Sequence, residues 1–235
     1  MSEPSRQVTP RTWSAAAAFP PRERPRRRQA ARAATTLALL ALVAACAARP
    51  PKPPPPPLLV TGPLCLSTLS QQRIAFERVT VGAGRGACAV ENAVRVDRLA
   101  IPWNRPAVLS CTLAAALDRF ERESVQTLAL RHLGQPVARI HQLGSYDCRR
   151  ENGGRPGRWS QHASGNAIDI GAFELSDGTV IKVAEGWSAR GPRRDFLREV
   201  ARSACQHFMV VLTPDGDGSH ADHFHFDVGP YRLCQ

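Results

Sequence analysis

Six cysteines downstream of the N-terminal region constrain the fold more than any other feature of this chain. They are Cys65, Cys88, Cys111, Cys148, Cys205 and Cys234. No two of them have the Cys-x-x-Cys spacing that is typical of structural zinc sites. An even number of cysteines in a secreted chain indicates disulfides, so we predict three of them, formed in an oxidising compartment. Many pairings are possible, and of these we expect the sequential one: 65–88, 111–148 and 205–234.

The first 45 residues have the organisation of a secretory signal. Arginines are concentrated at residues 22–32, and residues 35–45 form an apolar run that ends in small residues. The run is short for a membrane-spanning helix, which needs about 20 apolar residues. Val43-Ala44-Ala45-Cys46 resembles the lipobox of bacterial lipoproteins, in which the cysteine is lipidated. We therefore expect a lipoprotein-type signal peptide over residues 1–45 and a lipid anchor on Cys46, with a plain signal peptide as the alternative.

A proline-rich segment separates this signal from the rest of the chain. Residues 50–57 are proline except for Lys52, a composition that favours an extended polyproline II spacer. A ligand for a proline-binding domain is the alternative. We therefore predict three parts, namely the signal peptide (1–45), a tether (46–57) and one folded domain (58–235).

The formal net charge of +11 does not indicate nucleic-acid binding. Eight arginines and only two acidic residues lie in residues 1–45, which leaves 23 basic and 18 acidic residues, a charge of +5. A mildly basic domain can favour an anionic polymer or a lipid surface without requiring one.

Hydrophobic periodicity predicts an α+β domain. Residues 106–133 carry apolar side chains at three- and four-residue steps and are followed by Gly134, which predicts a helix, and residues 192–208 form a second predicted helix. Alternating or β-branched runs predict strands over residues 137–143, 166–173, 179–183, 210–212 and 223–228. Because helices and strands do not alternate strictly, we expect an antiparallel sheet with flanking helices, stabilised by disulfides.

Four of the seven histidines fall in two short windows. Residues 159–169 contain His162 and Asp169, and residues 220–225 contain His220, His223 and His225. Imidazoles and carboxylates are preferred ligands of Zn²⁺, and a catalytic zinc site uses three protein ligands and a water. A tight turn at Gly165 could fold His162 back toward the strand that carries Asp169. If the two predicted strands pair, His162, Asp169 and His225 can converge at one edge of the sheet. We therefore predict that Zn²⁺ is bound by His162, Asp169 and His225.

The first window also carries a family resemblance. Ser160-x-His162-x-x-Gly165-x-Ala167-x-Asp169 matches the SxHxxGxAxD motif of the D-Ala-D-Ala metallopeptidases, a group that includes the murein endopeptidases and the hedgehog signalling domain. Residues 58–235 as a whole resemble the bacterial extensin-like C-terminal domain family, in which Tyr-x-Cys-Arg, this motif and Asp-His-Phe-His recur. The resemblance implies the hedgehog/D-Ala-D-Ala peptidase fold, the same three zinc ligands and cleavage of peptide bonds in peptidoglycan.

The resemblance leaves the general base open. The peptidases have Glu-x-x-His before the last ligand, and here the Glu position is Asp222, which a regular strand would point away from His225. The spacing of His220, His223 and His225 is similar to that of the murein endopeptidases, in which the extra histidines assist catalysis. Either Asp222 or His223 is therefore the expected base. Arg149 matches an arginine that could bind a substrate carboxylate or stabilise an oxyanion.

Two functions remain as expectations. The first is a periplasmic zinc metallopeptidase, anchored as a lipoprotein in the (outer) membrane, that cleaves peptidoglycan stem peptides or cross-links as a D,D-carboxypeptidase or endopeptidase. The alternative is a zinc-containing lipoprotein that binds the wall without cutting it, because the hedgehog domain shows that an intact site need not imply peptidase activity. Hydrolysis of another wall amide or ester is a third possibility. Peptidoglycan and membrane lipid are the expected partners, and nucleic acid is not.

Overall fold

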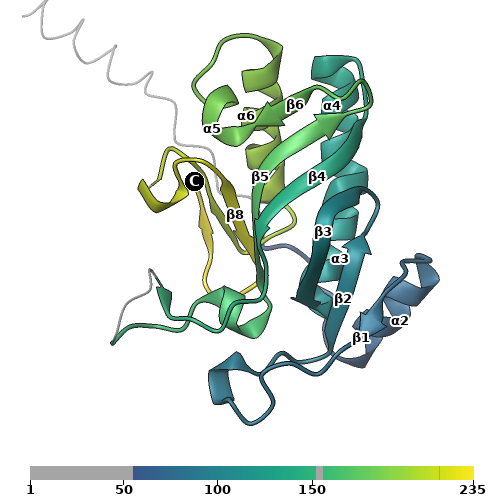
Figure 1. The fold of residues 1–235 in the computed structure, drawn as a ribbon, viewed down its shortest axis with the longest axis vertical. Helices are drawn as coiled ribbons and strands as arrows, with labels where there is room; N and C mark the ends of the chain where they lie inside the picture. Colours follow the sequence, from purple (N-terminus) through teal and green to yellow (C-terminus); the bar gives the residue numbers. More distant parts are fainter. Residues whose placement is uncertain (1–54, 152–155, 217) are drawn as a thin grey trace, which may run out of the picture. The chain divides into compact units, whose positions relative to one another are not determined.

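The computed structural model describes residues 55–151, 156–216 and 218–235 (Figure 1). The predicted signal peptide (1–45), Cys46 and residues 46–54 of the predicted tether lie outside the described residues, so these predictions stay predictions. Within the described ranges, no helix combines the length and the apolar character needed to cross a bilayer.

One mixed sheet organises the described part of the chain, with the order β1-β2-β3-β4-β5-β8-β7-β9 and with β6 paired to β5. Most neighbours are antiparallel, while β3–β4 and β7–β9 are parallel. The predicted α+β class with an antiparallel sheet is thus confirmed. The strands are β1 (Glu77–Arg78), β2 (Ala93–Arg98), β3 (Pro102–Ser110), β4 (Val137–Gly144), β5 (Ala167–Leu175), β6 (Val180–Lys182), β7 (Val210–Leu212), β8 (Phe224–Asp227) and β9 (Leu233–Cys234).

The helices α3, α4 and α6 pack against one face of this sheet (Figure 1). Phe120 of α3 contacts Phe226 of β8 with ring centroids 5.4 Å apart, and Phe196 of α6 contacts Phe173 of β5 at 5.3 Å. The other face of β5 and β8 is therefore free to carry polar side chains. The helical elements are α2 (Pro63–Gln71), η2 (Gly86–Cys88), α3 (Cys111–Phe120), the π-helical η3 (Glu121–Val125), α4 (Gln126–Leu133), η5 (Gln161–Ser164), α5 (Val183–Gly186), α6 (Pro192–Ala204) and η6 (Gly218–His220).

The prediction of a helix over residues 106–133 is wrong for its first five residues. Residues 106–110 continue β3, where Ala107 and Leu109 lie opposite residues of β2. The helix begins at Cys111 because the Ser110 side chain caps it, accepting a hydrogen bond from the Leu113 amide at 3.2 Å. The predicted end is confirmed, since Gly134 has a left-handed φ of 71°. The other predicted strands and the second helix are present with small shifts at their ends.

Three disulfides join the six cysteines, but two of the expected pairings are wrong. The structure has Cys65–Cys111, Cys88–Cys148 and Cys205–Cys234, of which only the last was expected. The first pair joins helices α2 and α3, and the second joins η2 to the segment after β4. Pairing therefore follows which elements pack together, and these are distant in sequence.

Candidate metal centre

His162 is held in the short turn η5 by its neighbours. The Ser160 hydroxyl caps this turn and accepts a hydrogen bond from the His162 amide at 3.3 Å. Gly165 ends it with φ 66°, and a Cβ there would lie 2.9 Å from the Ser110 nitrogen, so the position requires glycine. The imidazole is buried, and its Nδ1 lies 2.7 Å from the Ser145 carbonyl oxygen. Nδ1 therefore donates to that oxygen, which leaves Nε2 as an acceptor.

Asp169 and His225 lie directly opposite each other on the paired strands β5 and β8. Their carboxylate Oδ1 and imidazole Nδ1 are 3.0 Å apart. The other nitrogen of His225, Nε2, lies 3.3 Å from Oδ2 of Asp227, whose Oδ1 accepts a hydrogen bond from the Gly229 amide at 2.8 Å. Asp227 thus orients the ring, so that Nδ1 of His225 is directed at Asp169.

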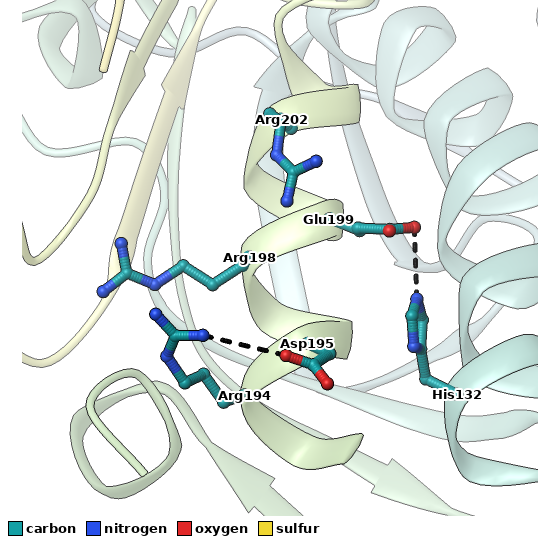
Figure 2. Close-up of a pocket in the computed structure, with 6 residues that line it drawn as sticks. All are labelled: His132, Arg194, Asp195, Arg198, Glu199 and Arg202. Carbon is teal, nitrogen blue, oxygen red and sulfur yellow. Dashed lines mark ion pairs between the residues drawn. The ribbon is translucent and has the colours of Figure 1, made fainter. Parts of the chain in front are cut away.

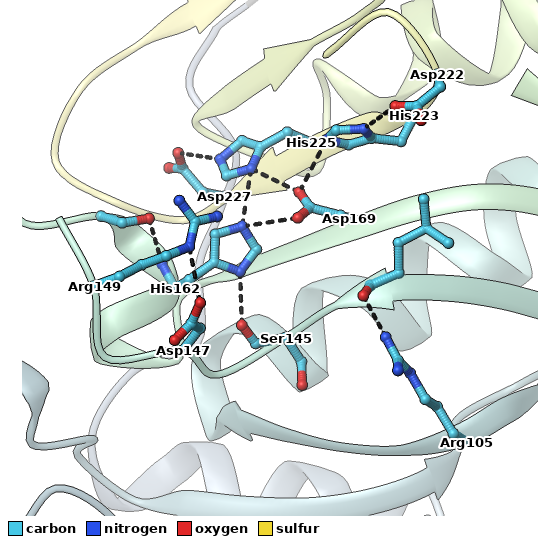
Figure 3. A network of polar contacts seen from close by, with 12 residues as sticks. Arg105, Ser145, Asp147, Arg149, His162, Asp169, Asp222, His223, His225 and Asp227 are labelled. Carbon is cyan, nitrogen blue, oxygen red and sulfur yellow. Dashed lines mark hydrogen bonds and ion pairs between the residues drawn. The ribbon is translucent and has the colours of Figure 1, made fainter. Parts of the chain in front are cut away.

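These three side chains converge with the spacing of a metal-ligand set (Figure 3). His162 Nε2 lies 3.2 Å from Asp169 Oδ2 and 3.3 Å from His225 Nδ1. Ligand atoms at tetrahedral zinc distances are about 3.3 Å apart, so the set fits this ion. The close approach also needs Gly144 on β4, where a Cβ would lie 2.9 Å from Asp169 Oδ2. The structure brings the three predicted ligands together, and the binding of an ion stays a prediction.

Charge interactions favour a cation at this position. Burial raises the pKa of Asp169, but hydrogen bonds and charge from His162 and His225 outweigh burial and hold this pKa below its ordinary value. Burial lowers the pKa of His225, but Asp169 and Asp227 together raise it to about 9. The space between these two carboxylates therefore attracts positive charge, which either a proton on His225 or a metal ion can supply.

The three side chains lie at the floor of a cleft of about 720 Å³. One wall comes from the segment that precedes and includes η5, and it carries two arginines. Further lining residues come from β7, β9 and the C-terminal residues, and some of these are apolar. The lining residues include Arg149, Arg158, Tyr231, Leu233, His220 and His223. The three candidate ligands therefore lie in a cleft lined by both charged and apolar residues.

The histidines of the second window take different positions around the set. The Nε2 atom of His223 lies 3.6 Å from Asp169 Oδ1, while its Nδ1 lies 2.8 Å from Asp222 Oδ1 (Figure 3). The His220 ring centroid lies 5.3 Å from that of His223 and 5.6 Å from that of His225. Asp222 precedes β8, which begins at Phe224, and it is exposed and not among the cleft-lining residues. His223 therefore reaches the centre, and Asp222 reaches His223.

Arg149 lines the cleft and forms an ion pair with Asp147 at 2.9 Å. Two contributors were not found by sequence reasoning, namely Gly144 and the Ser145 carbonyl. Neither offers a side chain that could have been recognised as a ligand partner. Asp227 also contributes, through the contact of its carboxylate with His225.

The remaining histidines lie apart from the centre. His141 pairs with Glu174 at 2.9 Å, and His207 accepts a hydrogen bond from Arg119 and contacts Ser124. His132 pairs with Glu199 at 3.1 Å in a second pocket of about 510 Å³ beside α6, where Arg194 also pairs with Asp195 (Figure 2). Asp195 and Glu199 thus offset part of the positive charge of that pocket, while Arg198 pairs with Asp215 outside it.

The family comparison agrees with the resemblance seen in the motifs. The model of the family described as extensin-like protein C-terminus matches residues 63–235. Comparisons with curated proteins and with solved structures found no match. Kinship with the D-Ala-D-Ala metallopeptidases thus stays a prediction. Since the match covers most of the chain, the protein belongs to the extensin-like protein C-terminus family.

Proposed function

We propose that this domain is a zinc-dependent hydrolase that cleaves peptide bonds in peptidoglycan. The observation that carries the proposal is the convergence of His162, Asp169 and His225 at the floor of an open cleft. The outer nitrogen of each imidazole is occupied by a hydrogen-bond acceptor, as is usual for histidines that bind metals. Three protein ligands is the number found in catalytic zinc sites, whereas structural sites use four. The SxHxxGxAxD match supports peptide-bond cleavage.

The general base in this proposal is His223. When bound, zinc would lower the pKa of a water molecule towards about 7 and polarise the scissile carbonyl. Asp222 accepts a hydrogen bond from Nδ1 of His223, which leaves Nε2 as the basic nitrogen on the side facing Asp169. His223 can therefore take a proton from the attacking water and return it to the leaving amine. Asp222 acts by fixing the tautomer and direction of His223, and His220 lies beside them to assist.

Arg149 supplies the substrate contact in this proposal. Arg149 lies in the cleft with its charge partly offset by Asp147 at 2.9 Å. A substrate carboxylate or a developing oxyanion can compete for the remaining guanidinium N–H groups. We further propose that the protein acts in the periplasm, held at the membrane by a lipidated Cys46.

A second candidate is a zinc-containing domain that binds the wall without cutting it. The observation that favours it is the exposed position of Asp222, outside the cleft, at the place where the peptidases have their catalytic Glu. In that case the cleft would retain its metal and its affinity for wall polymer but lack turnover.

The test uses residues 53–235, the compact unit that contains the whole sheet, refolded with its disulfides. Bound metal is measured first, and the protein is then incubated with purified peptidoglycan, with mass-spectrometric analysis of released fragments. His162→Ala should abolish both zinc and fragments, while His141→Ala, which removes an imidazole bonded to Glu174 away from the cleft, should leave both unchanged. Zinc without fragments would favour the binding domain, and a metal-free wild-type protein would refute the zinc site.

A further inference from the structure

The β7–β8 loop (residues 213–216 and 218–223) supplies one end of the cleft. Ser219, His220 and His223 line the cleft from this loop, whereas the three metal-binding candidates come from η5, β5 and β8. Catalytic groups lose efficiency when they are displaced by as little as about 1 Å, so a loop that carries them must be held in place. The contacts of Asp215 show what holds this one.

Asp215 connects the β7–β8 loop to two helical segments behind it. Its Oδ1 accepts hydrogen bonds from the Trp187 indole Nε1 at 2.8 Å and from Arg198 Nη2 at 3.3 Å. Its Oδ2 pairs with Arg198 Nη1. Trp187 directly follows α5, and Arg198 lies on α6, where its side chain projects away from Glu199 (Figure 2). The carboxylate is thus bound by donors from two elements that pack into the core.

Trp187 contacts both ends of the same loop. Besides its hydrogen bond to Asp215 near the start, its ring packs edge-on against Phe224, the first residue of β8, with centroids 5.5 Å apart. The Arg198 guanidinium stacks on the indole at 3.7 Å from its centroid. Trp187 is 5 % exposed, so its position is set by the core. Pairing of β7 with β8 closes the base of the loop, and one buried indole contacts both Asp215 within the loop and the first strand residue after it.

We propose that Asp215, clamped by Trp187 and Arg198, is a positioning residue that fixes His220 and His223 over the metal-ligand set. The catalytic part of this inference rests on the proposed hydrolase function. None of the three clamp residues lines the cleft, so the clamp acts only through the loop.

Two properties of Asp215 make the inference testable. The hydrogen bond from Trp187 lowers the pKa of Asp215, slight burial opposes this effect, and Arg198 adds to it. The pKa of Asp215 is therefore held below its ordinary value, and its carboxylate is ionised at neutral pH. The carboxylate is about half exposed, and exposed ion pairs contribute little to stability. Asp215→Ala should therefore fold, which allows its effect on the loop to be measured.

The experiment compares Asp215→Ala, Asp215→Asn and Trp187→Phe in residues 53–235. Asp177→Ala is the matched control, because Asp177 also accepts hydrogen bonds in a loop, from Gln135 and the Thr179 amide, at the β5–β6 turn. The rate of fragment release from purified peptidoglycan is measured at saturating and at low substrate. Zinc content and hydrogen exchange of peptides covering residues 213–223 are measured in parallel.

For Asp215→Ala we expect a fall in kcat of about 10- to 100-fold, with little change in KM. Zinc content should be unchanged, and hydrogen exchange should be faster in the β7–β8 loop alone. Asp215→Asn keeps an acceptor for Trp187 and should lose less activity, while Asp177→Ala should match the wild type. Trp187→Phe keeps the packing on Phe224 but loses the donor, so it should resemble Asp215→Ala.

Unchanged kcat in Asp215→Ala, beside an active wild type, would overturn the inference and leave the hydrolase intact. Loss of zinc in that variant would also overturn it, since the clamp would then act on the ligands. If the wild type cleaves nothing, the hydrolase proposal fails. Hydrogen exchange in the β7–β8 loop then still tests whether Asp215 holds the loop in place. Loop exchange as slow as in Asp177→Ala would refute the clamp, and faster exchange would support it.

Discussion

Zinc binding should compete with a proton on His225, and the pH dependence of this competition follows from the site. In the metal-free domain, Asp169 and Asp227 raise the pKa of His225 to about 9. The proton and the metal use the same nitrogen, Nδ1, which lies 3.0 Å from Asp169. Zinc must therefore displace this proton wherever the pH is below about 9.

The magnitude follows from the distance between the working pH and this pKa. At pH 7 the apparent zinc affinity should be about 100-fold weaker than its limit above pH 9, and it should rise about tenfold per pH unit in between. About one proton should be released per zinc ion bound at pH 7. Asp169 does not add to this slope, because its lowered pKa keeps it ionised throughout this range.

The same shift makes a prediction for stability without metal. The pKa of His225 in the folded domain is raised above its ordinary 6.5. Protonated His225 therefore stabilises the folded domain, and this stabilisation is fully present below pH 6.5. It is lost as the pH rises to about 9, by up to about 3 kcal/mol. The metal-free domain should therefore become less stable over this interval, while the zinc-loaded domain should not.

The assay is a competition titration with a chromophoric chelator at pH 6, 7, 8 and 9, with proton release measured in weakly buffered solution. Asp227→Asn is the informative variant, because it keeps an acceptor for His225 Nε2 but removes one of the charges that raise its pKa. The pH at which affinity levels off should move downwards in this variant. An affinity that is constant between pH 6 and 8 in the wild type would refute the assignment of His225.

Three further predictions concern the frame of the site. Gly144→Ala should weaken zinc binding about tenfold, because its Cβ would crowd Asp169 Oδ2 at 2.9 Å, whereas Gly218→Ala, with open space around it, should bind normally in the same titration. Burial raises the pKa of Glu121 to about 8, so urea unfolding should show stability falling from pH 4.5 to 8 by up to about 5 kcal/mol, a slope that Glu121→Gln should abolish. Replacing Cys88 and Cys148 together by Ala should cost about 2–5 kcal/mol, seen as a lower Tm, and an unchanged Tm would contradict this disulfide.

The convergence of the three candidate ligands could be predicted because its determinants are local in the sequence. Strand alternation places Asp169 and His225 on the faces away from Ile168, Ile170 and the flanking phenylalanines, and pairing of the two strands then brings them together. His162 follows from the turn that Gly165 allows. These conclusions required no knowledge of distant contacts beyond a single strand pair.

The errors all depend on contacts that are distant in sequence. Ala107 and Leu109 fit a helical stripe as well as an alternating strand, and only their pairing with β2 decides for the strand. The disulfide between Cys65 and Cys111 depends on the packing of α2 against α3. The Ser145 carbonyl, which accepts a hydrogen bond from His162, belongs to the backbone, and residue types do not reveal such partners.

The alternation along β8 has a consequence for how the centre is assembled. His225 stands between Phe224 and Phe226, which are both fully buried, and Asp169 stands between two buried isoleucines. A shift of strand register would have to expose these apolar side chains before it could separate the ligands. Folding of the core therefore arranges the three candidate ligands in advance, and the proposed zinc ion would have little conformational entropy to overcome on binding. A chelator should accordingly remove the metal and leave a folded domain, unlike a zinc finger, which unfolds when it loses its ion.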